Sequence, residues 1–439
     1  MSPRITPALL QASVELTAQV LRFDRPADKV LSDYFRKHRQ LGQNERAFLA
    51  ETVYAGLRRK GLIDHVLAEA GPMQAEKRSP LAEARAFAWA TLVRLRGFNV
   101  RELAPNEKSE AAQWLQRVKA AGRGDLPFEV RCDLPDWVVA RLRACLPADE
   151  LLCLAEALQQ PAPLDLRVNL LKADREEVLE QLTAAGIRAM PTPYSPTGIR
   201  LPDKPALQRH PLFLEGVIEV QDEGSQLLVH LLAPRRGEMV ADFCAGAGGK
   251  TLAMAALMRS TGRVYAFDVS EHRLAKLRPR LARSGASNID ARLIASEHDA
   301  KLGRLAGKLD RVLVDAPCTG LGTLRRNPDL KWRQHEADLE ALTRKQLSIL
   351  SAAARLLKPG GRLVYATCSL LPEENEAVVE AFLREHPEFR PLSAQRLLAM
   401  QSIGLDAGAL PSDDYLRLMP HVHGTDGFFA AAMERVHGF

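Results

Sequence analysis

Residues 239–251 read MVADFCAGAGGKT, an apolar stretch that runs into a glycine-rich turn. Glycines let a backbone turn sharply and approach a ligand beside the N-terminus of a following helix. A phosphate-binding loop needs the spacing G-x-x-x-x-G-K-[ST], and Cys244 stands where its first glycine would be. The stretch therefore predicts a strand, a ligand-binding turn and a helix, with a nucleotide triphosphatase as a minor alternative.

The alternation of apolar strands with helical segments continues along the rest of the sequence. Further apolar strands are expected at residues 263–267, 311–314 and 362–365, with helical segments between them. This order is typical of an α/β fold with a doubly wound, mainly parallel sheet, which binds ligands at the carboxyl ends of its strands. We predict such a Rossmann-like sheet over residues 226–439.

Three carboxylates follow successive apolar stretches of this region. Asp268 ends one predicted strand, Asp299 follows the next apolar stretch, and Asp315 follows another strand. A carboxylate close to twenty residues after the glycines suits hydrogen bonds to ribose hydroxyls, and Asp299 could face an adenine. Each one alone is more typical of a helix cap or a loop end, but three at successive strand ends favour a bound ligand.

Two cysteines, Cys318 and Cys368, each stand just beyond a predicted strand. A thiolate that adds to carbon 6 of cytosine makes carbon 5 nucleophilic enough to take a methyl group from a sulfonium. Lys250 can help to populate the thiolate, and Asp315 can hydrogen-bond the ring. The spacing leaves open which of the two cysteines attacks. The remaining cysteines in the N-terminal part fit small buried apolar positions, namely Cys132, Cys145 and Cys153.

The chain ahead of this region divides into two parts. Residues 1–145 have apolar positions at helical spacing and predict an all-helical domain. Residues 146–225 predict a small α+β module, with a strand at 164–169, a helix at 174–184 and short strands among prolines and glycines. The basic stretch at 325–332 suits either contact with an RNA backbone or a structured loop.

Composition limits the classes of function. The net charge is +6, and residues 1–150 carry 24 Lys and Arg against 19 Asp and Glu, which favours an acidic partner such as RNA. No apolar run approaches the ~20 residues of a membrane span, and the start lacks a signal-peptide core, so we expect a cytoplasmic protein. The six cysteines form no C-x-x-C pair or zinc spacing, so we expect no disulfide framework and no metal. Nothing in the sequence demands more than a monomer.

Taken together, the motifs resemble the Nop/Sun family of RNA cytosine-5 methyltransferases, and most closely its bacterial RsmB branch. The matching segments are 242–251, 315–318, 365–369, 372–375 and 426–429, although Ala247 stands where the family more usually has proline. The resemblance implies an RNA-recognition-like fold for the small module, where Arg167 and Asn169 match. It also implies a NusB-like RNA-binding fold for the helical domain.

The resemblance also implies the roles of individual residues. Cys368 would attack the base, Cys318 would assist product release, and Asp315 would contribute to catalysis. S-adenosylmethionine would be bound by the glycine turn and the three carboxylates: Cys244, Ala245, Gly246, Ala247, Gly248, Gly249, Lys250, Asp268, Asp299 and Asp315.

The substrate implied by the branch is 16S ribosomal RNA of the small subunit. Another ribosomal site or a transfer RNA is the first alternative. A non-catalytic RNA-binding assembly factor is a second, and the intact cysteines and Asp315 argue against it. A small-molecule methyltransferase is a third, and the helical first part and the second cysteine argue against that.

Overall fold

The computed structural model describes residues 5–73, 79–405 and 414–438. The chain forms two compact units. One, here called the helical unit, comprises Met1–Gln160 and Thr323–Glu336. The other, the sheet unit, comprises Pro161–Gly322 and Ala337–Phe439. The helical unit is therefore discontinuous, because it takes a short segment from the middle of the sheet unit's sequence.

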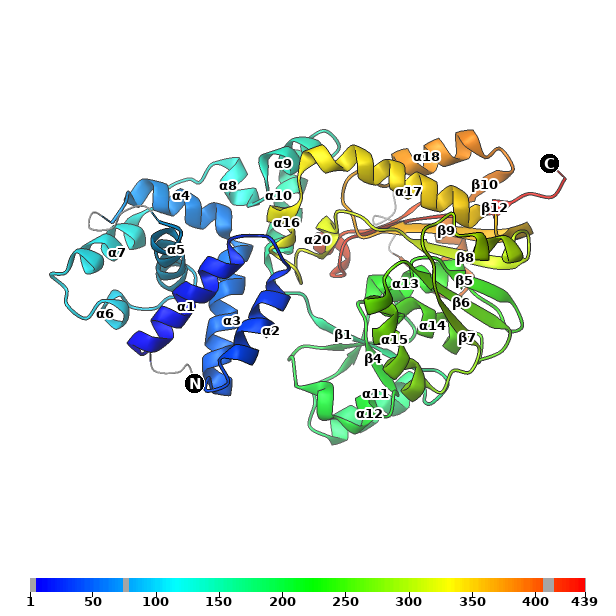
Figure 1. Cartoon of the computed structure of the whole chain (residues 1–439), viewed down its shortest axis with the longest axis horizontal. Helices are drawn as coiled ribbons and strands as arrows, with labels where there is room; N and C mark the ends of the chain where they lie inside the picture. Colours follow the sequence, from blue (N-terminus) through cyan, green and yellow to red (C-terminus); the bar gives the residue numbers. More distant parts are fainter. Residues whose placement is uncertain (1–4, 74–78, 406–413, 439) are drawn as a thin grey trace. The chain divides into compact units, whose positions relative to one another are not determined.

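The helical unit confirms the predicted helical N-terminal part (Figure 1). Its helices are α1 (Pro7–Val20), α2 (Ala27–Lys37), α3 (Gln43–Arg58), α4 (Lys60–Ala70), α5 (Pro80–Arg94), α6 (Val100–Leu103), α7 (Glu110–Ala120), α8 (Phe128–Cys132), α9 (Asp136–Arg143), α10 (Ala148–Gln159) and α16 (Leu330–Arg333). Local sequence starts several of them: the side chain of Thr6 accepts a hydrogen bond from the Leu9 amide and caps α1. Apolar faces then meet in one core that includes Phe48 and Trp114, both fully buried.

Residues 323–336 pack into the helical unit through buried polar contacts. The Lys331 ammonium lies 3.2 Å from the carboxylate of Asp133 and also donates to the carbonyl of Arg58 at 3.1 Å. The Trp332 indole donates to the Leu57 carbonyl, and the amide of Ala27 donates to the Asp329 carboxylate. These contacts favour the structured-loop interpretation of the basic stretch, because its lysine, Lys331, is buried within the protein.

The small module at the start of the sheet unit is a four-stranded antiparallel sheet in the order β2-β3-β1-β4. Its elements are β1 (Leu164–Val168), α11 (Arg175–Ala184), β2 (Met190–Pro191), β3 (Gly198–Leu201), α12 (Pro211–Leu214) and β4 (Ile218–Val220). The predicted strand and helix are confirmed. Asp174 and Glu177 form a capping box that starts α11, which explains the boundary at residue 174.

The large sheet has the order β10-β12-β9-β8-β5-β6-β7, with β11 beside β12. Its strands are β5 (Met239–Asp242), β6 (Arg263–Asp268), β7 (Ile289–Leu293), β8 (Leu309–Asp315), β9 (Leu357–Thr367), β10 (Phe389–Leu392), β11 (Leu416–Leu418) and β12 (Phe428–Arg435). The run from β9 to β7 is parallel, as predicted, and four of its strands match the predicted ones. β10, β11 and β12 add an antiparallel edge that the strand–helix alternation did not predict.

Helices cover both faces of this sheet, which makes it doubly wound. They are α13 (Glu223–Leu232), α14 (Gly249–Leu257), α15 (Glu271–Ser284), α17 (Leu339–Ala354), α18 (Glu376–Glu385), α19 (Ala394–Ala399) and α20 (Pro420–His423). One buried cluster joins strand residues to Leu350 of α17 and Phe382 of α18. A second joins them to Leu228 of α13 and Met254 of α14. Within the described ranges, no helix has the length and apolar character that crossing a membrane requires.

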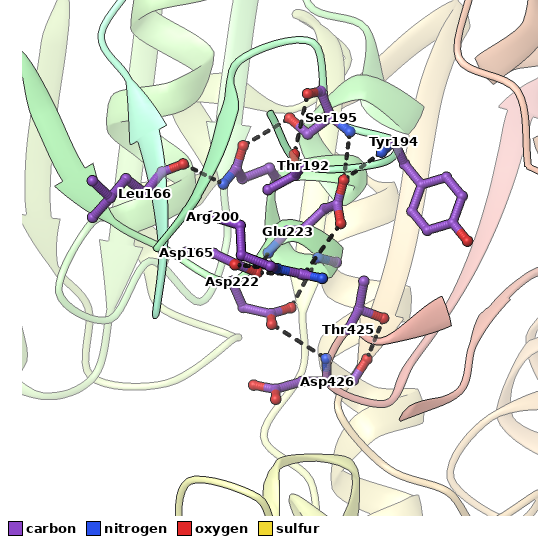
Figure 2. Close-up of polar contacts among 12 residues, drawn as sticks. Asp165, Leu166, Thr192, Tyr194, Ser195, Arg200, Asp222, Glu223, Thr425 and Asp426 are labelled. Carbon is purple, nitrogen blue, oxygen red and sulfur yellow. Dashed lines mark hydrogen bonds and ion pairs between the residues drawn. The ribbon is translucent and has the colours of Figure 1, made fainter. Parts of the chain in front are cut away.

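A buried charged network attaches the module to the large sheet (Figure 2). Arg200 of β3 donates two hydrogen bonds, at 2.8 and 2.9 Å, to the fully buried carboxylate of Asp165 in β1. Glu223, at the start of α13, accepts from the amides of Tyr194 and Ser195 and lies 3.5 Å from Arg200. Buried charges are stable only when they are paired in this way, so the network fixes the module against α13.

Candidate active site

The glycine-rich turn lies between β5 and α14, as predicted. Gly246 and Gly248 both have positive φ, a conformation that favours glycine. A Cβ atom on Gly248 would lie 2.2 Å from a methyl carbon of Leu277, whereas one on Gly246 would meet open space. The turn is therefore packed tightly against α15 at Gly248 and is open at Gly246, where a ligand can approach its backbone.

The carboxylates expected at this edge of the sheet differ in their surroundings. Asp268, at the end of β6, is buried and accepts from the amides of Gly246 and Ser270 at 2.8 and 2.7 Å. It therefore supports the glycine turn directly. Asp299 is half-buried, and its two oxygens accept from the amides of Ala295 and Lys301. The side chain of Asp299 acts as a cap for its own loop, and these bonds lower the pKa of its carboxyl.

Lys250 and Asp315 form an ion pair where the turn meets β8. The ammonium lies 2.6 Å from the Asp315 carboxylate, and both side chains are largely buried. Burial by itself lowers the pKa of Lys250, but the charge of Asp315, with those of Asp242 and Cys368, raises it overall. Lys250 is therefore held as a cation close to Cys368.

Asp242, the last residue of β5, is a buried carboxyl behind this pair. Its side chain accepts a hydrogen bond from the Thr251 hydroxyl at 2.7 Å. Burial raises its pKa to about 7, and the charges of Asp315 and Asp268 act in the same direction. The Thr251 bond and the Lys250 charge oppose that shift without cancelling it.

We predict that an Asp242→Asn variant removes a pH-dependent loss of stability. The carboxyl ionises at 3.8 in an unperturbed chain and at about 7 when folded, so unfolding releases a proton between these values. The contribution of Asp242 is then fully present below pH 3.8 and is lost as the pH rises through 7, by about 1 kcal/mol per pH unit. Urea unfolding of the unliganded protein between pH 4 and 8 measures this. The stability of the variant relative to the wild type should rise up to about pH 7 and then level off, and a constant difference would contradict the prediction.

Cys318 and Cys368 lie side by side, with their sulfurs 3.3 Å apart. Cys318 follows β8 and Cys368 follows β9, which are neighbouring parallel strands. The Gly322 amide donates to the carbonyl of Cys368 at 2.8 Å, which joins the two loops. The topology thus brings together two residues that are fifty positions apart in the sequence.

The surroundings of Cys318 favour the protonated form of its thiol. The hydrogen bond between the two thiols, burial, and the charges of Cys368 and Glu374 raise the pKa of Cys318 well above its ordinary value. Burial also raises the pKa of Cys244, which lies in the glycine turn. Cys318 is therefore a neutral thiol at neutral pH, and it can serve as a hydrogen-bond or proton donor.

The aromatic ring of Phe428 and the backbone of Gly427 complete the surroundings of the cysteine loops. Phe428 lies 5.9 Å from the Lys250 ammonium, measured to the ring centroid. The Gly427 amide donates to the Gly322 carbonyl, and a Cβ on Gly322 would lie 2.2 Å from the Gly427 oxygen. The motif at 426–429 thus packs directly on the loop that follows Cys318.

The small module supports the backbone of the glycine turn through arginine side chains. Arg167 of β1 donates to the Gly249 carbonyl at 2.6 Å, and burial lowers its pKa to about 10. Arg280 of α15 donates to the Ala247 carbonyl at 2.7 Å and pairs with Glu219 of β4. Two carbonyls of the turn are therefore held by arginines that the module anchors. Asn169, the other motif residue, donates to the carbonyls of Gly216 and Ser284.

Sequence reasoning missed several residues that organise the site. Glu374 lies within the segment 372–375 that carried part of the resemblance, yet its charge and position gave no hint of its contact with both cysteine loops. Gln346 and Arg280 lie on helices whose apolar spacing says nothing about polar partners across the fold. These three residues can be identified only from their contacts in the folded structure.

Comparisons with known proteins agree with this geometry. The family model described as 16S rRNA methyltransferase RsmB/F matches residues 229–434. A second model, the ferredoxin-like domain of RsmF/B-like methyltransferases, matches residues 134–208. The small module is thus ferredoxin-like, and the large sheet is a methyltransferase sheet.

Individual relatives extend the match over the whole chain. The chain is 31% identical to the probable ribosomal RNA small subunit methyltransferase B of Synechocystis sp. over 97% of its own length and 99% of that protein. It is 35% identical to the probable ribosomal RNA small subunit methyltransferase B of Bacillus subtilis over 69% of its length, an alignment that spans 66% of the relative. The crystal structure of PH0851 is 28% identical and has a TM-score of 0.79 over 99% of this chain and 100% of its own.

Motifs, topology and relatives thus agree with the resemblance inferred from the sequence. The chain belongs to the RsmB/F family of 16S rRNA methyltransferases.

Proposed function

We propose that this protein transfers a methyl group from S-adenosylmethionine to carbon 5 of a cytosine in 16S ribosomal RNA, through a covalent adduct between a cysteine and carbon 6. The observation that carries the proposal is the pair of cysteine sulfurs 3.3 Å apart, close to the Lys250–Asp315 ion pair. An RNA-binding module without catalysis has no use for that arrangement. Membership of the RsmB/F family supports RNA as the substrate.

The residues of the turn fit an S-adenosylmethionine site. Gly246 presents open space above its backbone, and Asp268 holds the Gly246 amide in place. We propose that residues 244–250, together with Asp268, Asp299 and Asp315, hold the cofactor, with Asp299 shaping the loop through the amides that it caps. When bound, S-adenosylmethionine supplies an electrophilic methyl group on a sulfonium.

Cys368 is the proposed nucleophile. The Lys250 ammonium lies close enough to interact with Cys368, so a cation stands beside the attacking sulfur. The thiolate would form a bond to carbon 6, and the electron pair of the 5,6 double bond would become available at carbon 5. Carbon 5 would then take the methyl group as the methyl–sulfur bond of the sulfonium breaks and leaves a neutral thioether. Asp315 can hydrogen-bond the ring edge and stabilise the charge that develops there.

Product release needs two further events. The proton on carbon 5 must leave to a base, and the sulfur–carbon 6 bond must break so that the double bond is restored. Cys318, whose sulfur lies 3.3 Å from that of Cys368, is the proposed participant in this elimination. The opposite assignment, with Cys318 as the nucleophile, is the chemical alternative that the variants in the Discussion test.

We propose three functional parts: a NusB-like helical RNA-binding domain at 1–145, an RNA-recognition-like module at 146–225 and a catalytic domain at 226–439. The protein would act as a monomer, because the proposed site draws its residues from one chain. Its helical domain, with the basic excess of the N-terminal part, would contribute to binding of the ribosomal RNA.

The direct test uses tritiated S-adenosylmethionine and small-subunit ribosomal RNA from cells that lack this protein. Digestion of the RNA to nucleosides should place the label in 5-methylcytosine. Label in transfer RNA alone would change the substrate, and label in another nucleoside would refute the carbon 5 reaction. Binding of RNA without any label would support the second candidate, an assembly factor that keeps the fold.

We also predict that Arg280→Ala weakens the binding of S-adenosylmethionine about tenfold, the order expected for losing a charge-assisted hydrogen bond. Arg280 donates to the Ala247 carbonyl, so its removal frees one side of the turn. Isothermal titration calorimetry measures the dissociation constant. Arg278→Ala is the matched control, because Arg278 is an exposed arginine on the same helix. Equal affinities of the two variants would show that the turn needs no support from Arg280.

A further inference from the structure

Glu374 is a fully buried carboxylate between the two cysteine loops. It lies in the turn between β9 and α18, and none of its surface is exposed. A carboxylate in such a place is costly unless hydrogen bonds satisfy its oxygens. The hydrogen-bond partners of Glu374 therefore indicate which parts of the fold the carboxylate organises.

Each cysteine loop donates to this carboxylate through the residue that directly follows the cysteine. Thr319, after Cys318, donates its amide to one oxygen at 2.9 Å and its hydroxyl to the other at 2.5 Å. Ser369, after Cys368, donates its hydroxyl to the second oxygen. The Thr319 and Ser369 hydroxyls are themselves 3.1 Å apart.

Gln346 of α17 extends the contact to the other side of Cys318. Its side-chain amide donates to Glu374 at 2.9 Å and to the carbonyl of Pro317 at 2.9 Å. The backbone on both sides of Cys318, and the residue after Cys368, are thus tied to one carboxylate. The turn itself is fixed by the Tyr365 hydroxyl, which donates to the Glu374 carbonyl at 2.6 Å.

We propose that Glu374 is a positioning residue for the methyl-transfer reaction: its carboxylate holds the loops of Cys318 and Cys368 in the one arrangement in which their sulfurs touch. This inference rests on the proposed function. A neutral amide replaces the carboxylate poorly, because it keeps one accepting oxygen for the donors of Thr319, Ser369 and Gln346, and the two hydroxyls would have to turn and accept from its NH₂ group instead. Hydrogen bonds to an ionised acceptor are also stronger than those to a neutral one.

The charge of Glu374 has a second consequence for Cys318. Together with the hydrogen bond between the two thiols and with burial, it raises the pKa of Cys318. The positive charge of Lys250, by contrast, interacts with Cys368. The charge of Glu374 therefore favours Cys318 as a neutral thiol.

The test compares Glu374→Gln and Glu374→Asp with Glu376→Gln as the control. Glu376 is the nearby carboxylate on α18 that pairs with Arg417, and none of its contacts described here involves a cysteine loop. Turnover with excess RNA and S-adenosylmethionine should fall about a hundredfold in Glu374→Gln, the size expected when reacting groups are misplaced by about 1 Å. The affinity for S-adenosylmethionine should stay within about threefold of the wild type, because the glycine turn is untouched.

A second measurement does not depend on methyl transfer. The rate of Cys318 alkylation by iodoacetamide, followed by peptide mass spectrometry across pH 6–10, should shift to lower pH in Glu374→Gln. Glu374→Asp keeps the charge and should restore most of the wild-type pH profile. If Glu374 had only a structural role, Glu374→Gln and Glu374→Asp would lose stability to a similar extent. The pH profile of Cys318 alkylation in the protein that still folds would then match that of the wild type.

Each outcome decides the inference. Glu374→Gln with the turnover and alkylation profile of Glu376→Gln would overturn it. If the wild type transfers no methyl group while the alkylation profile still shifts, the proposed function fails and the positioning of the cysteines stands. If Glu374→Gln does not fold, Thr319→Val removes one hydroxyl of the network, and about tenfold slower turnover with normal folding is expected; unchanged turnover would overturn the inference.

Discussion

Replacing Cys368 with alanine should lower methyl transfer to RNA by on the order of ten-thousandfold or more, the scale of losing the proposed covalent nucleophile. The sulfur is the only group in the proposed mechanism that can activate carbon 5, so no neighbouring side chain compensates. Binding of RNA and of S-adenosylmethionine should remain close to normal, because the substitution removes one sulfur atom and leaves the glycine turn and the Lys250–Asp315 ion pair in place. The measurement is single-turnover transfer of tritium to the RNA, with filter binding as the check on affinity.

The Cys318→Ala variant tests the proposed role of Cys318 in product release. If Cys318 assists elimination, the covalent adduct between Cys368 and the RNA accumulates and appears as a slower band on a denaturing gel. The double variant Cys318→Ala with Cys368→Ala should form no adduct. An adduct in Cys368→Ala instead would reverse the two roles, and both cysteines would still be part of the reaction. Cys153→Ala is the matched control, because Cys153 is an exposed cysteine on α10 with no proposed role.

Replacing Lys331 with alanine should destabilise the helical unit by about 3–5 kcal/mol, the cost of breaking a buried ion pair from one side. The side chains of Lys331 and Asp133 are 4% and 0% exposed, so the variant leaves the Asp133 charge buried with less compensation. Calorimetry of the full chain should show the transition of the helical unit at a lower temperature. The transition of the sheet unit should stay in place.

Arg36→Ala is the control for that prediction. Arg36 and Asp33 also form an ion pair in the helical unit, but their side chains are 69% and 39% exposed. An exposed pair contributes roughly 0–1 kcal/mol, so this variant should change the transition little. Equal effects of the two substitutions would mean that Lys331 does not anchor its segment. In that case residues 325–332 would return as a candidate contact with RNA.

Local signals in the sequence were enough for the central sheet and for the two cysteines. The glycine turn, the strand ends at Asp268 and Asp315, and the parallel order follow from patterns within a few residues. A strand–helix alternation also dictates that loops after neighbouring strands meet, which is why Cys318 and Cys368 could be paired without a structure.

The antiparallel edge and the network around Glu374 could not be predicted in the same way. β12 reads as a short apolar run, and nothing near it indicates that it pairs with β9. The partners of Glu374 come from three separate segments, so its role depends on contacts between residues far apart in sequence. Asp299 is a further example: its place after an apolar stretch could be read from the sequence, but the two amides of its own loop that donate to it could not.

The short segment that completes the helical unit also sets an order of events during synthesis. Residues 1–160 leave the ribosome well before Thr323–Glu336, which the same unit contains. At typical translation speeds the delay is roughly 8–30 s, long compared with the folding of a helical domain. During that interval Asp133 has no Lys331 to pair with, so the nascent helical bundle is incomplete while the strands of the sheet unit are being synthesised. Slowing the ribosome between these points should therefore prolong a protease-sensitive intermediate, even though the finished chain is unchanged.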